Sequence, residues 1–213
     1  MGRAMARAES PPRRARTRRL LAVPTLAVVF AGLATLPATA DTSGGANHVV
    51  LASVTVDGAS ALRSGVQIAS AGSPTVASAN IARAQSQSCT GCRAAAAAFQ
   101  AVFVTHSADT VAPQNAAVAV NSNCTSCDSF AFAYQYVLST PGPVYLSGAA
   151  QQQIAGIRQQ VADAMTSGLP DDQLDIRLHD LAGQFKAVID NGLQQAGVPA
   201  DGAANERADI APA

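Results

Sequence analysis

The sequence predicts an α+β fold, in which an antiparallel sheet of about three β-hairpin repeats is followed by a C-terminal αα-hairpin. Three observations lead to this prediction. One segment of the chain recurs at an offset of 35 residues. Large and small side chains alternate along that segment with the period of a β-strand. Beyond residue 146, apolar residues are instead spaced by three and four, as in an amphipathic helix.

The first 40 residues predict an export signal, because an Arg-rich start is followed by an apolar run and a small-residue cleavage site. Seven Arg and one acid precede residue 41, the run from Leu20 to Leu36 carries no charge, and Ala38-Thr39-Ala40 supplies the cleavage site. We therefore expect a secreted or extracytoplasmic mature chain, residues 41–213, that does not span the membrane. The alternative is an uncleaved N-terminal helix that anchors the chain, although Pro24 interrupts its apolar run.

The charge of the mature chain argues against nucleic-acid binding. The whole chain has 14 basic and 14 acidic residues, but removing residues 1–40 leaves seven basic and 13 acidic ones, a net charge of −6. An acidic body repels a phosphate backbone. Aromatic residues make up only 4% of the chain and Trp is absent, so we expect a thin, closely packed core.

Residues 41–145 form the repeat region. Residues 80–105 and 115–140 align without a gap, and 11 of the 26 positions are identical. A fainter copy precedes them. In each copy an Asn stands 20 residues before a Gln, and the three pairs are Asn47 and Gln67, Asn80 and Gln100, and Asn115 and Gln135.

The turns of the repeat carry its cysteines. Where the later copies have Cys-Thr-x-Cys, the first has Asp57-Gly58, which predicts a hairpin turn between two apolar stretches. By alignment, each Cys pair also lies at a hairpin turn. The flanking residues support strands, since large residues alternate with Ala, Gln and Val over 130–138. The run Ala94–Ala98 favours a competing interpretation, a helix with the Cys pair at its N-terminus.

Residues 146–196 predict two helices packed on the sheet within the same domain. Ser147 is a plausible N-cap for the first helix, and Gly168-Leu169-Pro170 ends it. The second helix has an apolar stripe, which we interpret as core packing: Leu174, Leu178, Leu181, Phe185 and Val188. Residues 197–213 lack periodicity and predict a disordered tail.

The four cysteines are the strongest chemical signal: Cys89, Cys92, Cys124 and Cys127. An even number of cysteines in an exported protein predicts disulfides. Bonds between the turns would close loops of ~35 residues, worth ~3.8 kcal/mol each, against ~1.9 kcal/mol for bonds within a turn. In a flat meander, however, the two turns lie ~9.6 Å apart, which favours bonds within each turn. We give the geometry slightly more weight.

Two other uses of the same cysteines remain open. Four thiolates on two turns would hold one Zn²⁺, as in a zinc ribbon. Alternatively, a Cys-x-x-Cys pair would exchange disulfides with a substrate, although such a site needs a basic neighbour or a helix N-terminus. Arg93 follows the first pair, but Asp128 follows the second. The sequence otherwise predicts no cofactor, and Zn²⁺ is the alternative.

The remaining polar residues give weaker signals. Gln67, Gln100 and Gln135 would project from the small-residue face of equivalent strands, where they bond to each other and the backbone or form a polar row for a ligand. No HExxH zinc-protease motif, nucleophile elbow or Ser-x-x-Lys site occurs. The sequence therefore offers no catalytic constellation, and we expect no enzymatic activity.

Several segments of the chain resemble a secreted actinobacterial family with CxxC hairpin repeats and a helical end, whose function is unknown. The resemblance covers residues 47–195 and is carried by Asn115–Asn121, Cys124-Thr-Ser-Cys127, Phe132–Tyr136 and Pro141–Val144. Some members are labelled peptide zinc metalloprotease proteins. The resemblance implies a structural role for the four cysteines.

The function that we expect is that of an exported, non-enzymatic binding or structural module with an envelope or secreted partner. The first alternative is a zinc-binding accessory domain of a peptidase system. The second is a thiol–disulfide exchange protein.

Overall fold

The computed structural model describes residues 46–105, 108–199 and 201–211, and the predicted export signal lies outside these ranges. Within them the chain forms seven strands and two helices. In chain order these are β1 (Asn47–Val54), β2 (Ser60–Ala71), β3 (Thr75–Gln87), β4 (Arg93–Thr105), β5 (Thr110–Ser122), β6 (Asp128–Thr140), α1 (Gly148–Thr166), α2 (Asp171–Gln195) and β7 (Asp201–Ala211). None of the described helices is both long and apolar enough to cross a membrane.

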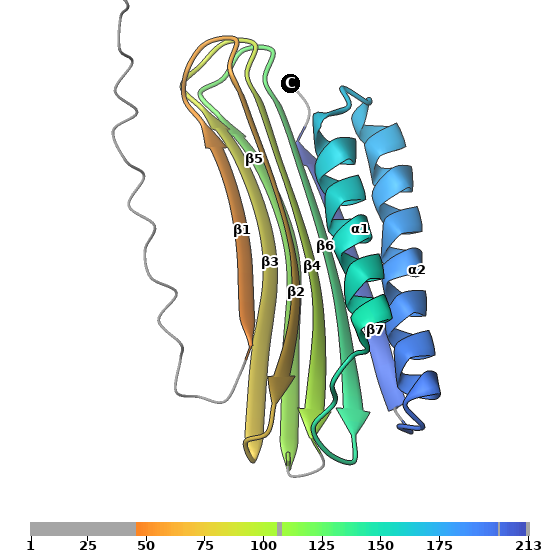
Figure 1. Ribbon diagram of the computed structural model, residues 1–213. Coiled ribbons are helices and arrows are strands. Elements are labelled where there is room, and N and C mark those ends of the chain that lie inside the picture. Colours follow the sequence, from red (N-terminus) through yellow and green to blue (C-terminus); the bar gives the residue numbers. More distant parts are fainter. Residues whose placement is uncertain (1–45, 106–107, 200, 212–213) are drawn as a thin grey trace, which may run out of the picture. The chain divides into compact units, whose positions relative to one another are not determined.

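The strands form two sheets, and each copy of the repeat contributes one strand to each sheet (Figure 1). Sheet A has the order β1-β3-β5 and is parallel throughout. Sheet B has the order β2-β4-β6-β7, in which β7 alone is antiparallel to its neighbour. The chain thus winds as a two-sheet β-solenoid, with one repeat per coil.

The prediction of an antiparallel sheet of β-hairpins is wrong. The two strands on either side of each turn do not pair with each other but lie in different sheets. The ladder instead joins equivalent residues of successive copies: Asn80 pairs with Asn115 and Phe99 with Tyr134, both 35 residues apart. The repeat length of 35 residues is therefore the sequence separation between paired residues in the β3–β5 and β4–β6 ladders. A turn signal indicates where the chain reverses, but not whether the reversed strand joins the same sheet.

The first coil departs from the alignment predicted by the sequence. His48, not Asn47, stands opposite Asn80, whereas Gln67 is opposite Gln100 as expected. The first coil therefore has one residue fewer between its two sheets than the second, because Asp57-Gly58 makes a shorter turn than the Cys-containing segments.

Small side chains fill the space between the sheets. The inward face of β4 is Ala94, Ala96 and Ala98, and it packs with Ala82 and Ala84 of sheet A. On the opposite face, Phe99, Phe132 and Tyr134 pack against Leu181 and Phe185 of α2. The alternation of large and small residues in the sequence thus separates two cores, one between the sheets and one under the helices.

The helices cover the outer face of sheet B (Figure 1). Ser147 caps α1, its hydroxyl accepting from the Ala150 N–H at 3.2 Å. The predicted stripe of α2 is buried from Leu174 to Phe185, but Ile189 takes the fully buried position next to Val188. The helices occur within the predicted range 146–196, as an αα-hairpin.

The predicted disordered tail, 197–213, contains strand β7. This strand pairs with β6 from Ser139↔Asp201 to Ser129↔Ala211. Its sequence gives little sign of a strand, because its apolar residues do not alternate. The strand forms because the edge of β6 has unpaired backbone N–H and C=O groups, which gain hydrogen bonds from an extended segment that reaches them.

Candidate functional site

The two Cys-containing turns lie one above the other in successive coils. They connect β3 to β4 and β5 to β6, and each takes the chain from sheet A to sheet B. Backbone hydrogen bonds join them: Gly91 N–H donates to Thr125 O at 2.9 Å and Asp128 N–H donates to Cys92 O at 2.9 Å. Gly91 and Ser126 both have a positive φ. The stack therefore continues the sheet ladders through the turns.

The turn of the first coil completes this stack without cysteines. Asp57 accepts the Thr90 N–H with its carboxylate at 2.7 Å, and Gly58 N–H donates to Thr90 O at 2.9 Å. The positive φ of Gly58 matches that of Gly91. Asp57-Gly58 thus forms the turn that the Cys-containing segments form in the later coils, as the alignment suggested. The turn connects a strand of sheet A to a strand of sheet B rather than two strands of one hairpin.

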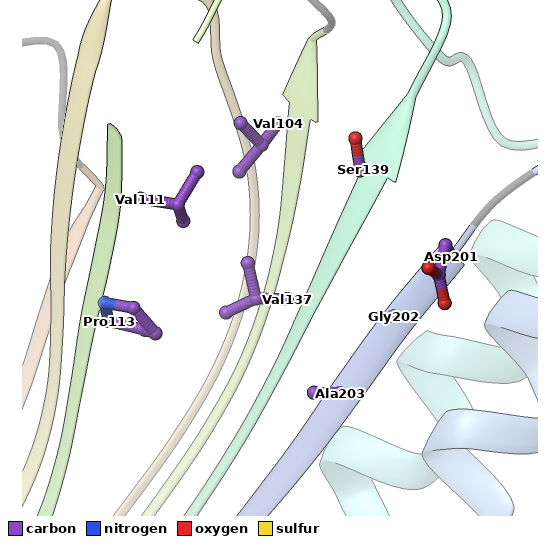
Figure 2. A pocket seen from close by; sticks show the side chains of 8 residues that line it. All are labelled: Val104, Val111, Pro113, Val137, Ser139, Asp201, Gly202 and Ala203. Atoms are coloured by element: carbon purple, nitrogen blue, oxygen red, sulfur yellow. The ribbon is translucent and has the colours of Figure 1, made fainter. Parts of the chain in front are cut away.

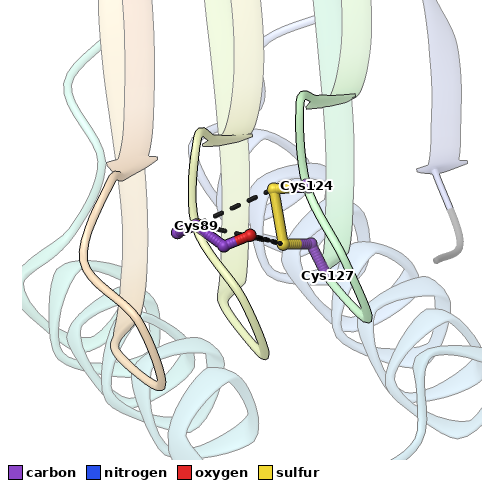
Figure 3. A group of neighbouring side chains, drawn as sticks. All are labelled: Cys89, Cys124 and Cys127. Carbon is purple, nitrogen blue, oxygen red and sulfur yellow. Dashed lines mark hydrogen bonds between the residues drawn. A yellow bond between two sulfur atoms is a disulfide. The ribbon is translucent and has the colours of Figure 1, made fainter.

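The cysteines form disulfides within each turn, Cys89–Cys92 and Cys124–Cys127. Their Cα atoms are 6.2 Å and 5.7 Å apart, within the usual range for a disulfide. The argument from a flat meander favoured this pairing but misjudged the distance between the turns. In the stack, the Cys89 sulfur lies 3.7 Å from that of Cys124 and 3.8 Å from that of Cys127 (Figure 3).

The surroundings of the sulfur atoms suit disulfides better than thiolates. Their polar neighbours include carbonyl oxygens: Cys92 Sγ lies 3.1 Å from Val56 O, and Cys127 Sγ lies 3.3 Å from Cys89 O. A carbonyl oxygen accepts from a thiol but repels a thiolate. The nearby guanidinium of Arg93 is already bound to two carboxylates. A reactive cysteine needs the reverse, an electropositive environment.

Three of the cysteines are close enough together to hold a metal ion. The sulfur atoms of Cys89, Cys124 and Cys127 all lie within 4.8 Å of one another. Each is in a disulfide, so both bonds would have to be reduced before the sulfurs could act as thiolate ligands. Cys92 is outside this group of three, although it follows Cys89 in the same turn.

An ion cluster lies next to the disulfides. Arg93 and Asp128 follow the two Cys pairs, are partners in the β4–β6 ladder, and form an ion pair. Arg93 also binds Asp171 in the first turn of α2, so the cluster ties the helical layer to sheet B. Burial, followed by the neighbouring Asp171, raises the pKa of Asp128 to about 6.

The predicted polar row is a hydrogen-bonded ladder between the sheets. Gln135 Nε2 donates to Gln100 Oε1 at 2.8 Å, and Gln100 Nε2 donates to Gln67 Oε1 at 2.7 Å. Gln100 and Gln135 are 0% and 1% exposed. Each side chain thus forms a hydrogen bond with the next, and burial closes the row to a ligand at Gln100 and Gln135, whereas Gln67 at its end is partly exposed.

A second ladder, missed in the sequence, runs beside the first. Asn80 Nδ2 donates to Asn115 Oδ1 at 2.9 Å, and His48 Nδ1 lies 3.0 Å from Asn80 Oδ1. Burial lowers the pKa of His48, which keeps its ring neutral. The recurrence of Asn80 and Asn115 was visible in the sequence, but the misplaced first coil concealed that His48 occupies the same position.

The outer face of sheet A is one surface that is open to a partner. Sheet B is enclosed by sheet A and the helices, whereas the outer face of sheet A exposes apolar side chains. Val49, Leu51 and Val118 are 51%, 59% and 37% exposed. Sequence reasoning missed this face because it assigned the apolar residues of the first copy to a hairpin with one buried side.

A cleft opens between β5 and β7 at the last coil (Figure 2). Its volume is about 370 Å³. Val104, Val111, Pro113 and Val137 form its apolar part, and Ser139 and Asp201 supply its polar groups. It lies where a further coil would continue the space between the sheets.

Comparisons with family models, curated proteins and solved structures find no match for this chain.

Proposed function

We propose that the chain is an exported, non-enzymatic binding module that presents the outer face of sheet A to an envelope or secreted partner. The observation that carries the proposal is the asymmetry of the two sheets. Helices cover the outer face of sheet B, whereas sheet A keeps the apolar side chains of Val49, Leu51 and Val118 in solvent. Exposed apolar residues that gather on one face are typical of interaction surfaces.

The charge and residue types of this face indicate which class of partner it would bind. In-register strands place its side chains in straight columns, such as Leu51, Arg83 and Val118. Arg83 is the charged residue of that column, and its neighbours Gln85 and Gln87 are neutral amides. Such a weakly charged, partly apolar surface fits a protein partner with a complementary apolar surface. It lacks the aromatic residues that commonly stack on sugars or bases.

The cysteines and the two described histidines have structural roles, which supports a non-enzymatic function. The cysteines are in disulfides, and His48 is bound to Asn80 between the sheets. His179 lies 2.9 Å from Glu206 and links α2 to β7. The exported location rests on the signal predicted over residues 1–40 and agrees with the use of disulfides.

The experiment is a binding assay on envelope preparations of the source organism, with the labelled protein and two matched variants. Val118→Asp places a charge on the outer face of sheet A. Ile176→Asp makes the same kind of change at an exposed position of α2. We expect saturable binding that V118D weakens at least tenfold and I176D leaves unchanged. Equal binding by both variants, or catalytic turnover that Cys variants abolish, would contradict the proposal.

A second candidate is a zinc-binding accessory domain, favoured by the group of Cys89, Cys124 and Cys127 and by the resemblance to peptide zinc metalloprotease proteins. Two equivalents of a phosphine reductant would convert the two disulfides to four thiols, which lose protons on binding Zn²⁺. One zinc per chain that survives dialysis and is lost in Cys124→Ser would support this function. Thiol–disulfide exchange has less support, because carbonyl oxygens surround the sulfurs.

A further inference from the structure

The edges of the two sheets differ in how they are protected. Unpaired strand edges attract further strands, and proteins usually block them with charges, Pro or a covering segment. At the last coil, the Ala119 N–H of β5 donates to the Asp209 carboxylate of β7 at 2.8 Å. Pro113 lies six residues earlier on the same edge and has no N–H to offer. The β5 edge is therefore blocked at both positions.

Sheet B is protected at both ends. At the first coil, the Arg158 guanidinium of α1 donates to Val66 O of β2 at 3.2 Å. At the other end, β7 carries Asp201, Glu206, Arg207 and Asp209 within eleven residues. A second strand would have to displace the first contact or accommodate these charges. Neither edge of sheet B is favourable for strand addition.

The β1 edge of sheet A has no such protection within the strand. Asn47–Val54 contains no Lys, Arg, Asp, Glu or Pro, and its single His is turned inward against Asn80. It is rich in Val and Leu, which favour strands. Val49 and Leu51 expose their side chains beside this edge. Among the residues that the structure describes, strand β1 thus combines an open backbone edge with an exposed apolar surface.

The ladders show which backbone groups of β1 face outward. Backbone groups of successive residues point to opposite sides of a strand. Since Ala119 N–H points away from β3, the even-numbered residues of β5 bind β3. With the registers of the two ladders, the odd-numbered residues of β3 then bind β1, and the even-numbered residues of β1 bind β3. The N–H and C=O groups of β1 that point outward therefore belong to Val49, Leu51 and Ser53. These are the groups that a further strand would bind.

We infer that β1 pairs antiparallel with β1 of a second copy of this chain, about a two-fold axis at Val50. In this register Val49 lies opposite the partner's Leu51, and Leu51 opposite the partner's Val49. Each of the two exposed apolar side chains then has an apolar partner across the interface, and seven of the eight residues of β1 take part. The result is a six-stranded sheet made from two copies of sheet A.

A second copy is the occupant that fits the symmetry of the strand. Residues 41–213 carry a net charge of −6, so two copies repel each other at long range and need an uncharged contact. Strand β1 is such a contact. An isologous pair also needs a segment that complements itself, and the exchange of Val49 with Leu51 across the axis provides this. The outer face of sheet A stays open, so the pairing does not depend on the proposed function.

The test is the oligomeric state of the full chain, purified as processed by the cell, and of two charge variants. V49K/L51K places a Lys opposite a Lys twice in the proposed register, whereas V49E/L51K places a Glu opposite a Lys twice. Both variants remove the same apolar side chains. We expect sedimentation equilibrium to show a dimer for the unmodified protein. The dissociation constant of the dimer should be at least about tenfold higher for V49K/L51K than for V49E/L51K. All three proteins should have the circular dichroism spectrum of the folded chain.

Two results would overturn the inference. One is a monomer for the unmodified protein up to 200 μM, a concentration chosen to exceed that of a weak dimer. The other is a dimer whose dissociation constant is the same in the two charge variants, which would place the interface elsewhere. Failure of the dimer would leave the binding assay with V118D unaffected, because Val118 lies on β5 at the opposite edge of sheet A.

Discussion

At the residue scale, the first coil differs from the others at two positions, where a larger side chain at one is matched by a smaller one at the other. His48 takes the position of Asn80 and Asn115, and Gly65 takes the position of Ala98 and Ala133. The two differences belong together, because a Cβ atom on Gly65 would lie 2.6 Å from His48 Nε2. The imidazole ring thus occupies the space that the missing methyl group leaves.

This compensation predicts a rescue. Gly65→Ala alone should destabilise the protein by about 1–3 kcal/mol, because the methyl group also meets Val50 at 2.9 Å and the interior is closely packed. H48N/G65A, which gives the first coil the Asn and Ala of the later ones, should recover most of that loss. Urea unfolding of the four proteins of the double-mutant cycle measures the coupling. Additive effects would mean that the ring and the glycine are independent.

The raised pKa of Asp128 predicts that this carboxylate stabilises the folded protein at low pH, which is the reverse of the usual effect of a carboxylate. Its pKa is raised to about 6 in the folded protein, so the folded state binds more protons than the unfolded state between about pH 4 and 6. Arg93 from β4 and Asp171 from α2 are the charged groups that face it. Its contribution to stability is therefore fully present below its unfolded pKa and is lost as pH rises through 6.

The corresponding experiment compares the unmodified protein with Asp128→Asn. As pH falls from 7 to 4.5, the unmodified protein should gain stability relative to D128N, measured as the difference in urea unfolding free energy. The buried His48 acts in the opposite direction, since its lowered pKa costs stability below about pH 6.5, but it is present in both proteins. A constant difference across this range would show that Asp128 keeps an ordinary pKa.

At the element scale, each turn is clasped by its own disulfide. Because such a bond closes only about four residues, C124S/C127S should lose about 2 kcal/mol of unfolding free energy and remain folded. Bonds between the turns would each close ~35 residues, and their removal would cost about twice as much. Peptide mapping by mass spectrometry without reductant identifies the pairing directly. Fragments that join Cys89 to Cys124 or Cys127 would refute the local pairing.

The sequence was informative about elements where periodicity is local. The stripe from Leu174 to Phe185 predicted a helix, and the alternation over 130–138 predicted a strand with one large-residue and one small-residue face. Strand β7 could not be predicted in this way. It forms because β6 offers an edge, and that edge is a property of the assembled sheet rather than of residues 201–211.

At the scale of the whole molecule, the repeat length was visible in the sequence but its geometrical meaning was not. An offset of 35 residues is compatible with consecutive hairpins and with stacked coils, because both place equivalent residues in equivalent environments. Ala94, Ala96 and Ala98 favour stacking, since a face of small side chains allows a second sheet to pack against it. The same stacking explains why Gln100 and Gln135 are a buried ladder and not a ligand site.

The most direct test of the stacked-coil architecture is a nuclear Overhauser experiment on the isotopically labelled, purified protein. We expect cross-peaks between residues 35 apart, such as Asn80 with Asn115 and Phe99 with Tyr134, which are partners in the parallel ladders. A β-hairpin centred on the first Cys turn would instead give a strong Hα–Hα cross-peak between residues such as Gln85 and Ala96. Observing that cross-peak, with none between residues 35 apart, would contradict the two-sheet solenoid.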